Sequence, residues 1–153
     1  MDLITTGRSL IELGHILPYA VTVRQNPDLA TRLRVIRFGL NICVNLQVDI
    51  LVNLPRLSTA AVTASVSILE ALKSSGSAES LRRLELALAV APLGAVCLHL
   101  EHFTQLRSLL LNIEPHFKVT VGSAVSSIEL PLLELLVVRA APMVLLDALA
   151  DYR

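Results

Sequence analysis

One apolar pattern recurs along the chain at nearly constant spacing, and it restricts the folds open to this sequence more than any other feature. The pattern is a leucine, two residues, an apolar residue, one residue and a second apolar residue. It occurs in five segments, at 33–38, 57–62, 81–86, 106–111 and 133–138. The first leucines of successive segments are 24, 24, 25 and 27 positions apart. Because one short unit cannot bury its own leucines, we expect the five segments to stack beside one another.

Helix signals lie between these segments. Residues 45–54 place apolar side chains at helical spacing. Ser67-Ile-Leu-Glu70 has the form of a capping box and predicts a helix start, and Pro92 predicts the start of a third helix. Residues 117–127 are typical partly of a strand, and 142–152 predict a last helix.

The first 32 residues differ from the rest and predict a helical cap. Ser9-Leu-Ile-Glu12 matches a second capping box and predicts a helix start, and we expect that helix to end at Pro18. The tripeptide Asn-Pro-Asp at 26–28 supplies an N-cap, a proline at the first helical position and an acid in the first turn. It therefore predicts a short helix over 27–32 that leads directly into the first strand.

Strand segments that alternate with helix signals predict an α/β fold. The spacing of the segments falls within the range of about 20 to 29 residues that is typical of leucine-rich repeats. We therefore expect a leucine-rich-repeat-like solenoid of about five parallel strand–helix repeats with an N-terminal helical cap. The cap would occupy 1–32 and the repeats 33–153, within a single domain spanning 1–153.

The composition restricts the classes of partner that this chain can bind. Thirteen basic residues balance thirteen acidic ones, so no strong positive field is available to hold nucleic acid, and we expect no nucleic-acid partner. Hydrophobic residues make up 54% of the chain, and 32 of the 153 residues are leucine, which excludes intrinsic disorder. Low net charge combined with high hydropathy also leaves little repulsion between copies, which favours self-association.

The high hydropathy raises the question of a membrane span. A spanning helix needs about 18 or more apolar residues without charge. The longest uncharged run, 86–100, has fifteen residues and contains Pro92 and Gly94. The beginning of the sequence also makes a poor signal peptide. We therefore expect no membrane span and a cytoplasmic or nuclear location.

Five pieces of the chain, 26–36, 54–57, 80–86, 103–109 and 129–138, resemble fungal F-box proteins with degenerate leucine-rich repeats. The resemblance lies in the Asn-Pro-Asp-Leu-Ala entry and in the Leu-Pro-x-Leu units, and it covers about residues 17–150. It implies that a protein of this kind recruits substrates to a ubiquitin ligase. This chain would then supply the part that recognises the substrate.

Two departures from that family are visible in the sequence. Residues 1–16 are too short to hold the helical F-box module. The asparagine that follows regular leucine-rich strands is present as Asn41, whereas Ser65, Ala89, Glu114 and Ala141 stand at the equivalent positions. We therefore expect irregular repeats, in which the buried backbone of the turns finds other hydrogen-bond partners.

Strand alternation predicts which side chains the sheet displays on the face away from its core. The candidate partner-binding residues on that face are Arg37, Arg83, Glu85, Leu110, Leu135, Val137 and Arg139. Arginine suits planar, bidentate recognition of a protein, and apolar side chains beside it are typical of an interaction site. The alternative is that neighbouring loops or further repeats cover these residues.

Arginine also recurs at a fixed place in the repeats. Arg34, Arg82 and Arg107 occupy the same repeat position, immediately before the displayed part of each strand. Next to this position, Arg83 and Glu85 lie on one strand face, where the spacing predicts a solvated ion pair.

Catalytic and metal-binding signals are weak. His99 and His102 could share one side of a helix, but Cys97 would point elsewhere and no metal-binding motif is present, so we expect no metal. The sequence has neither a glycine-rich phosphate loop nor a nucleophile elbow, and we expect no cofactor and no enzymatic activity. Cys43 and Cys97 do not form a disulfide framework and are expected to be buried free thiols.

These observations favour protein–protein recognition. The expected role is the substrate-binding repeat region of an F-box-like ubiquitin-ligase receptor, with an unknown substrate protein as the partner. The alternative is a self-assembling structural protein whose apolar repeat ends pair between copies. Terminal repeats need polar caps, and residues 138–149 offer few polar groups.

Overall fold

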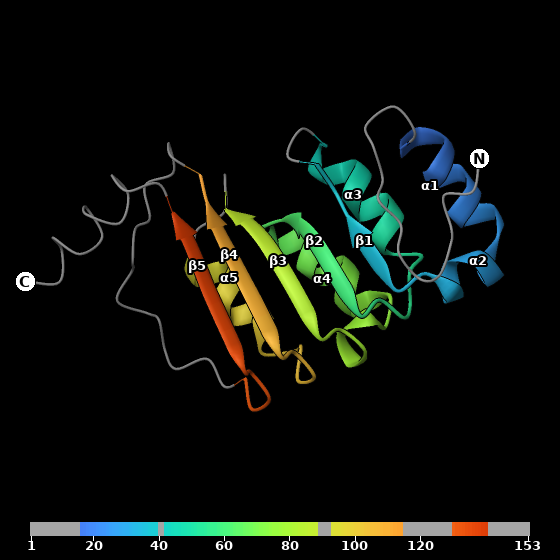
Figure 1. Cartoon of the computed structure of the whole chain (residues 1–153). Coiled ribbons are helices and arrows are strands. Elements are labelled where there is room, and N and C mark those ends of the chain that lie inside the picture. Colours follow the sequence, from blue (N-terminus) through green and yellow to red (C-terminus); the bar gives the residue numbers. More distant parts are fainter. Residues whose placement is uncertain (1–15, 40–41, 89–92, 115–129, 141–153) are drawn as a thin grey trace, which may run out of the picture.

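The computed structural model describes residues 16–39, 42–88, 93–114 and 130–140 (Figure 1). Short helices and short strands alternate through this part of the chain. In chain order the elements are α1 (Ile16–Gln25), α2 (Pro27–Arg32), β1 (Val35–Arg37), α3 (Val44–Leu51), β2 (Thr59–Thr63), α4 (Val66–Ser74), the 3-10 helix η2 (Ser77–Glu79), β3 (Arg83–Leu88), α5 (Leu93–Leu100), β4 (Ser108–Ile113) and β5 (Leu135–Ala140). This alternation is the α/β fold that the sequence predicts.

The five strands form one parallel sheet, and their order in space is their order in the chain. The central apolar residues of the five sequence segments lie side by side in one row across the sheet: Ile36, Ala60, Leu84, Leu109 and Leu136. The prediction that the segments stack as neighbouring parallel strands is therefore confirmed, together with the register that their spacing implies.

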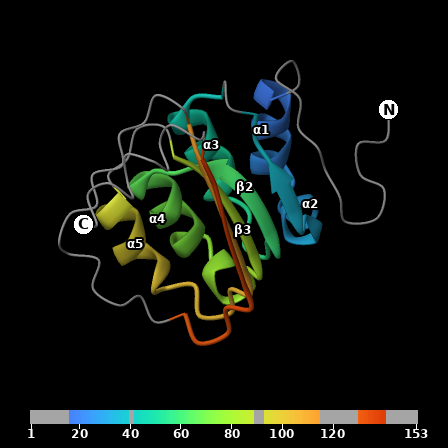
Figure 2. The ribbon, with the colours of Figure 1, turned by 60° about the vertical axis from the view of Figure 1, so that its left-hand side comes forward.

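The helices are arranged as a second layer. α3 packs beside α4 and α4 beside α5, behind the sheet in Figure 1 and along one side of it in Figure 2. α1 packs against α2 and α3 at the β1 end of the molecule. Figure 1 views the sheet from the other side, where no described helix lies in front of β2 to β5.

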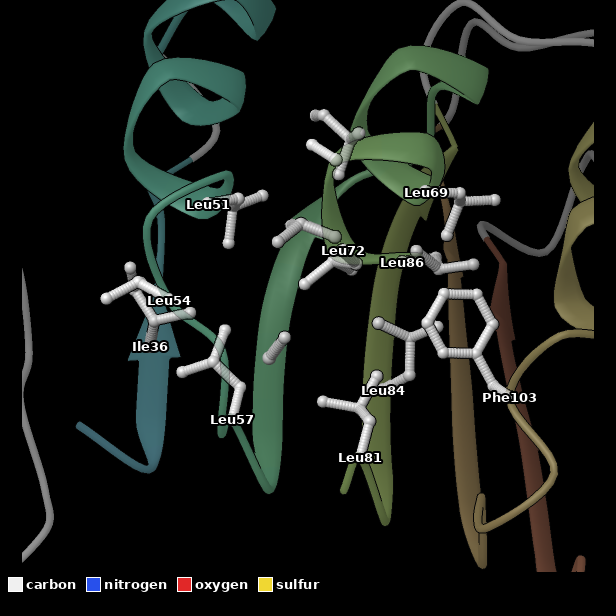
Figure 3. Close-up of a cluster of buried hydrophobic side chains, with 14 of the residues drawn as sticks. Ile36, Leu51, Leu54, Leu57, Leu69, Leu72, Leu81, Leu84, Leu86 and Phe103 are labelled. Carbon is white, nitrogen blue, oxygen red and sulfur yellow. The ribbon is translucent and has the colours of Figure 1, made fainter. Parts of the chain in front are cut away.

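The core lies between the sheet and the helix layer (Figure 3). Ile36 and Leu84 point into it from the strands, and Leu51 and Leu72 from α3 and α4. These four side chains are completely buried, and Phe103 packs among them from the turn after α5. Burial of a leucine or isoleucine side chain contributes about 1.5 to 3 kcal/mol, so the buried residues of the repeated pattern contribute substantially to stability.

Some helix starts differ from the sequence predictions. The helix predicted over 27–32 is present as α2, and its cap Asn26 accepts a hydrogen bond from the Leu29 amide at 3.3 Å. Pro18, however, does not end a helix, because it lies in the first turn of α1, where its missing N–H would have no partner in any case. Ser67 does not cap α4 either, because the helix begins at Val66.

A buried serine joins two neighbouring repeats. The Ser77 hydroxyl, in η2, donates a hydrogen bond to the Leu54 carbonyl and accepts one from the Leu57 amide at 3.2 Å. Ser77 is fully buried, and within the described ranges Gln47 is the other buried polar residue. Both side chains supply hydrogen-bond partners to buried backbone groups of nearby turns.

The last strand is less well covered than the others. Leu136 is 56% exposed although it lies in the same row as Leu84, which is fully buried. Val138 on the same strand is 49% exposed. The capping box predicted at 9–12 and the elements predicted over 117–127 and 142–152 lie outside the described residues. In the part that is described, no helix has the length and apolar character needed to cross a membrane.

Candidate protein interaction face

The sheet face opposite the helices, which we call the open face, displays side chains in three rows that cross the strands. The rows follow from the register and comprise Val35, Thr59, Arg83, Ser108 and Leu135; Arg37, Ala61, Glu85, Leu110 and Val137; and Thr63, Ala87, Asn112 and Arg139. All seven predicted partner-binding residues belong to these rows, so the sheet brings them onto one surface.

The cationic members of the set are all accessible to a partner. Arg37, Arg83 and Arg139 are exposed, and they stand on β1, β3 and β5. Leu135 is 51% exposed, and Val137, two residues further along β5, is half-buried. The open face therefore presents three guanidinium groups around apolar area concentrated on β5.

Leu110 lies on the open face as predicted, but the expectation that its side chain is exposed there is wrong. Its side chain is buried, with 4% of its surface exposed. In the second row it lies between Glu85 and Val137, on strands about 4.8 Å to either side. Leu110 is flanked by a strand on each side, whereas Leu135 has a described strand on one side.

Glu85 forms a hydrogen bond with Asn112 instead of the predicted ion pair with Arg83. Its Oε1 accepts a hydrogen bond from Asn112 Nδ2 at 2.8 Å, and Glu85 is half-buried. The ion pair predicted between Arg83 and Glu85 is not formed, since the salt bridge found in the described part of the chain joins Arg107 to Glu134. Arg83 is consequently left with its charge available to a partner.

A hollow of about 400 Å³ lies where the C-terminal ends of β2, β3 and β4 meet the open face. Thr63, Glu85 and Asn112 line it, together with Phe38 and Glu114. The alternation of the strands places the first three on this face. Phe38 and Glu114 were missed because each follows the end of a strand, where alternation no longer predicts the direction of a side chain.

The histidines and cysteines in the described part of the chain do not assemble a second site. Lys73 Nζ lies 3.2 Å from His102 Nε2, and the rings of His99 and His102 are 6.4 Å apart. Among the described residues no group of three or more candidate ligands could hold a metal ion. Cys97 is half-buried, and burial raises the pKa of its thiol. Cys43 is exposed, contrary to the expectation that it is buried.

Comparison with known proteins adds no relative. No protein-family model, no curated protein and no solved structure matches this chain.

Proposed function

We propose that this chain is a protein-recognition module and that the open face is its docking surface. In this proposal the strand–helix units continue one another as a leucine-rich-repeat-like solenoid. The resemblance to fungal F-box proteins extends the proposal to the substrate-binding repeat region of an F-box-like ubiquitin-ligase receptor. Displayed side chains perform recognition of this kind, so the proposal assigns no covalent step to the chain.

The observation that carries the proposal is that the described helices cover one face of a parallel sheet. Parallel sheets are normally covered on both faces, because the crossover helices lie on both sides. Here α3, α4 and α5 lie together on one face (Figure 2). The described strands thus present a broad surface on the other side, which a partner can cover.

The chemistry of the open face indicates the kind of partner. Arg37, Arg83 and Arg139 are exposed cations, whereas Glu85, the acid in these rows, is bonded to Asn112. Guanidinium groups pair bidentately with carboxylates, and exposed apolar residues such as Leu135 add contact area. The matching partner is a protein segment with acidic side chains that flank an apolar one.

Affinity capture on the full chain followed by titration of the recovered partner tests the proposal. The variant Arg83→Glu with Leu135→Asp reverses one charge and removes one apolar contact on the open face. Two central interface positions of this kind are each worth about 2 kcal/mol, so we expect binding to weaken at least about a hundredfold. Leu110 is left unchanged because its burial would confound the result.

A matched control places the same two changes elsewhere. Arg24→Glu with Leu98→Asp also reverses one arginine and removes one exposed leucine, on α1 and α5. We expect this control to bind like the parent chain. Equal binding by all three proteins, at equal folded stability, would remove the open face as the docking surface.

A second candidate function is self-assembly, and the β5 end of the sheet favours it. Leu132, Leu135, Leu136 and Val138 are all between 41% and 56% exposed. Apolar side chains exposed on the last described strand suit pairing with another copy. A defined oligomer in sedimentation velocity, converted to monomer by Leu136→Asp with Val138→Lys, would support this reading. A monomer at all concentrations would exclude it.

A further inference from the structure

A second hollow, which we call the edge groove, lies at the N-terminal ends of β1, β2 and β3, at the lower edge of the sheet in Figure 1. Its volume is about 710 Å³. Three arginines line it, Arg34, Arg56 and Arg82, with Glu79 as the carboxylate among the lining residues. The groove therefore holds an excess of positive charge in a chain whose total charge is zero.

The repeat architecture places two of these arginines on either side of one serine. The Arg34 carbonyl accepts a hydrogen bond from the Ser58 amide at 2.8 Å, and the Ser58 carbonyl accepts one from the Arg82 amide at 2.9 Å. Arg34, Ser58 and Arg82 therefore lie side by side, each immediately before one of three successive strands. At a strand spacing of about 4.8 Å, the backbones of the two arginines are about 10 Å apart. Two arginine side chains can converge on one small group across that distance.

The third arginine helps to fix the first. Arg56 follows α3, and its carbonyl accepts a hydrogen bond from Arg34 Nη1 at 2.9 Å. This bond ties the Arg34 guanidinium to the backbone at the groove and leaves its other N–H groups to face a ligand. Anchoring of this kind lowers the entropy cost of binding, because the side chain is already ordered.

The three guanidinium groups have no carboxylate partner in the described part of the chain. The next arginine in the same repeat position shows the contrast. Arg107 Nη1 lies 3.1 Å from Glu134 Oε1, so its charge is balanced by the residue that immediately precedes the next strand, β5. In the edge groove the residue beside Arg34, immediately before the next strand, is Ser58 instead of an acid. Its hydroxyl donates to the Arg34 carbonyl at 3.0 Å, so it leaves the arginine charge uncompensated.

We propose that the edge groove binds a phosphoryl group through Arg34, Arg56 and Arg82. Planar guanidinium groups donate paired hydrogen bonds to phosphate oxygens, and the groove supplies several such groups around one hollow. A phosphoryl group carries about two negative charges near neutral pH, which matches the excess of cations over Glu79. This proposal is independent of the docking surface, because neither Arg83 nor Leu135 lines the edge groove.

The test is isothermal titration of the full chain at constant ionic strength in chloride. One arm uses inorganic phosphate, and the other uses phosphoserine blocked at both ends, so the two sources of a phosphoryl group are compared. We expect saturable binding with one site in at least one arm. Tighter binding of blocked phosphoserine assigns the groove to a phosphorylated protein segment, whereas equal or tighter binding of inorganic phosphate assigns it to the free ion.

Matched variants show whether the groove is the site. Arg56→Gln and Arg82→Gln each remove one exposed cation from it, and each is expected to weaken binding at least about tenfold. Arg24→Gln removes the same charge from α1 and is expected to bind like the parent. The proposal is overturned if neither arm saturates in the millimolar range. It is also overturned if the two groove variants bind like the parent, or if Arg24→Gln weakens binding as much as they do.

Discussion

Both the oxygen and the nitrogen of the Gln47 side-chain amide form hydrogen bonds with Thr63, the last residue of β2. Gln47 Oε1 accepts a hydrogen bond from the Thr63 amide at 3.1 Å, and Nε2 donates to Thr63 Oγ1 at 2.9 Å. Nε2 also donates to the Ile42 carbonyl at 2.9 Å. One buried amide thus joins the turn before α3 to the end of the next strand, and it satisfies backbone groups that would otherwise lack partners.

Removal of this amide should destabilise the fold markedly. Gln47→Leu introduces an apolar side chain of similar size and leaves the buried Ile42 carbonyl and the half-buried Thr63 amide without their Gln47 partner. Each unsatisfied group costs about 1 to 3 kcal/mol, so we expect a loss of about 3 kcal/mol in the free energy of unfolding. Urea denaturation measures this loss, with Asn53→Ala as the control, since Asn53 makes an exposed bond to the Asp49 carbonyl. Ordinary surface substitutions change the free energy of unfolding by less than about 0.5 kcal/mol. A loss as small as that for Gln47→Leu would contradict the role assigned to Gln47.

Ser77 should show the same dependence on burial. Ser77→Ala removes the donor to the Leu54 carbonyl and the acceptor for the Leu57 amide, and we expect a cost of about 2 kcal/mol. Ser74→Ala changes the same residue type at an exposed position of α4 and should cost less than about 0.5 kcal/mol. Equal urea midpoints for the two variants would show that Ser77 does not hold the repeats together.

The register of the sheet allows a comparison within one row. Leu84→Ala empties a fully buried position and should cost about 3 kcal/mol. Leu136→Ala alters the same row position on β5, where the side chain is 56% exposed, and should cost less than about 1 kcal/mol. Unfolding free energies measured at an unchanged denaturant slope test the difference. Equal losses would mean that Leu136 is buried in solution, as in an assembly of copies.

The two thiols should differ in reactivity. Burial raises the pKa of the Cys97 thiol, so a smaller fraction is thiolate at a given pH, whereas Cys43 is exposed. We expect iodoacetamide to alkylate Cys43 first near pH 8 and both thiols at similar rates in urea, as mass spectrometry would detect. Because the folded chain holds the Cys97 proton more tightly than the unfolded chain, stability should fall as pH rises through the ordinary thiol pKa of about 8.5. Faster alkylation of Cys97 than of Cys43 in the folded chain would contradict this account.

The spacing of five leucines was sufficient to predict the parallel strands and their register. The pattern returns after 24 to 27 residues, which is enough chain for one connecting segment to lead from each strand to the next parallel strand. The local cap at Asn26 was equally readable, because a cap depends on adjacent residues. Both features are set by short-range sequence and by a repeated period.

The sequence predicted less of the candidate site, because burial there depends on neighbours in space. Alternation assigned Leu110 to the open face correctly but could not show that its side chain is buried there. The bond between Glu85 and Asn112 joins residues 27 positions apart, and it replaced the local pair with Arg83 that sequence spacing favoured. Gln47 gave no signal at all, since a glutamine in a helix is normally expected on the surface.

Photo-crosslinking from single positions tests the central claim most directly. A photoreactive side chain replaces Arg83 on the open face in one protein and Leu98 on the helix side in another, and each is irradiated with the captured partner. The open-face account predicts a discrete crosslinked product of chain and partner from position 83 and none from position 98. A product from position 98, with none from position 83, would contradict it.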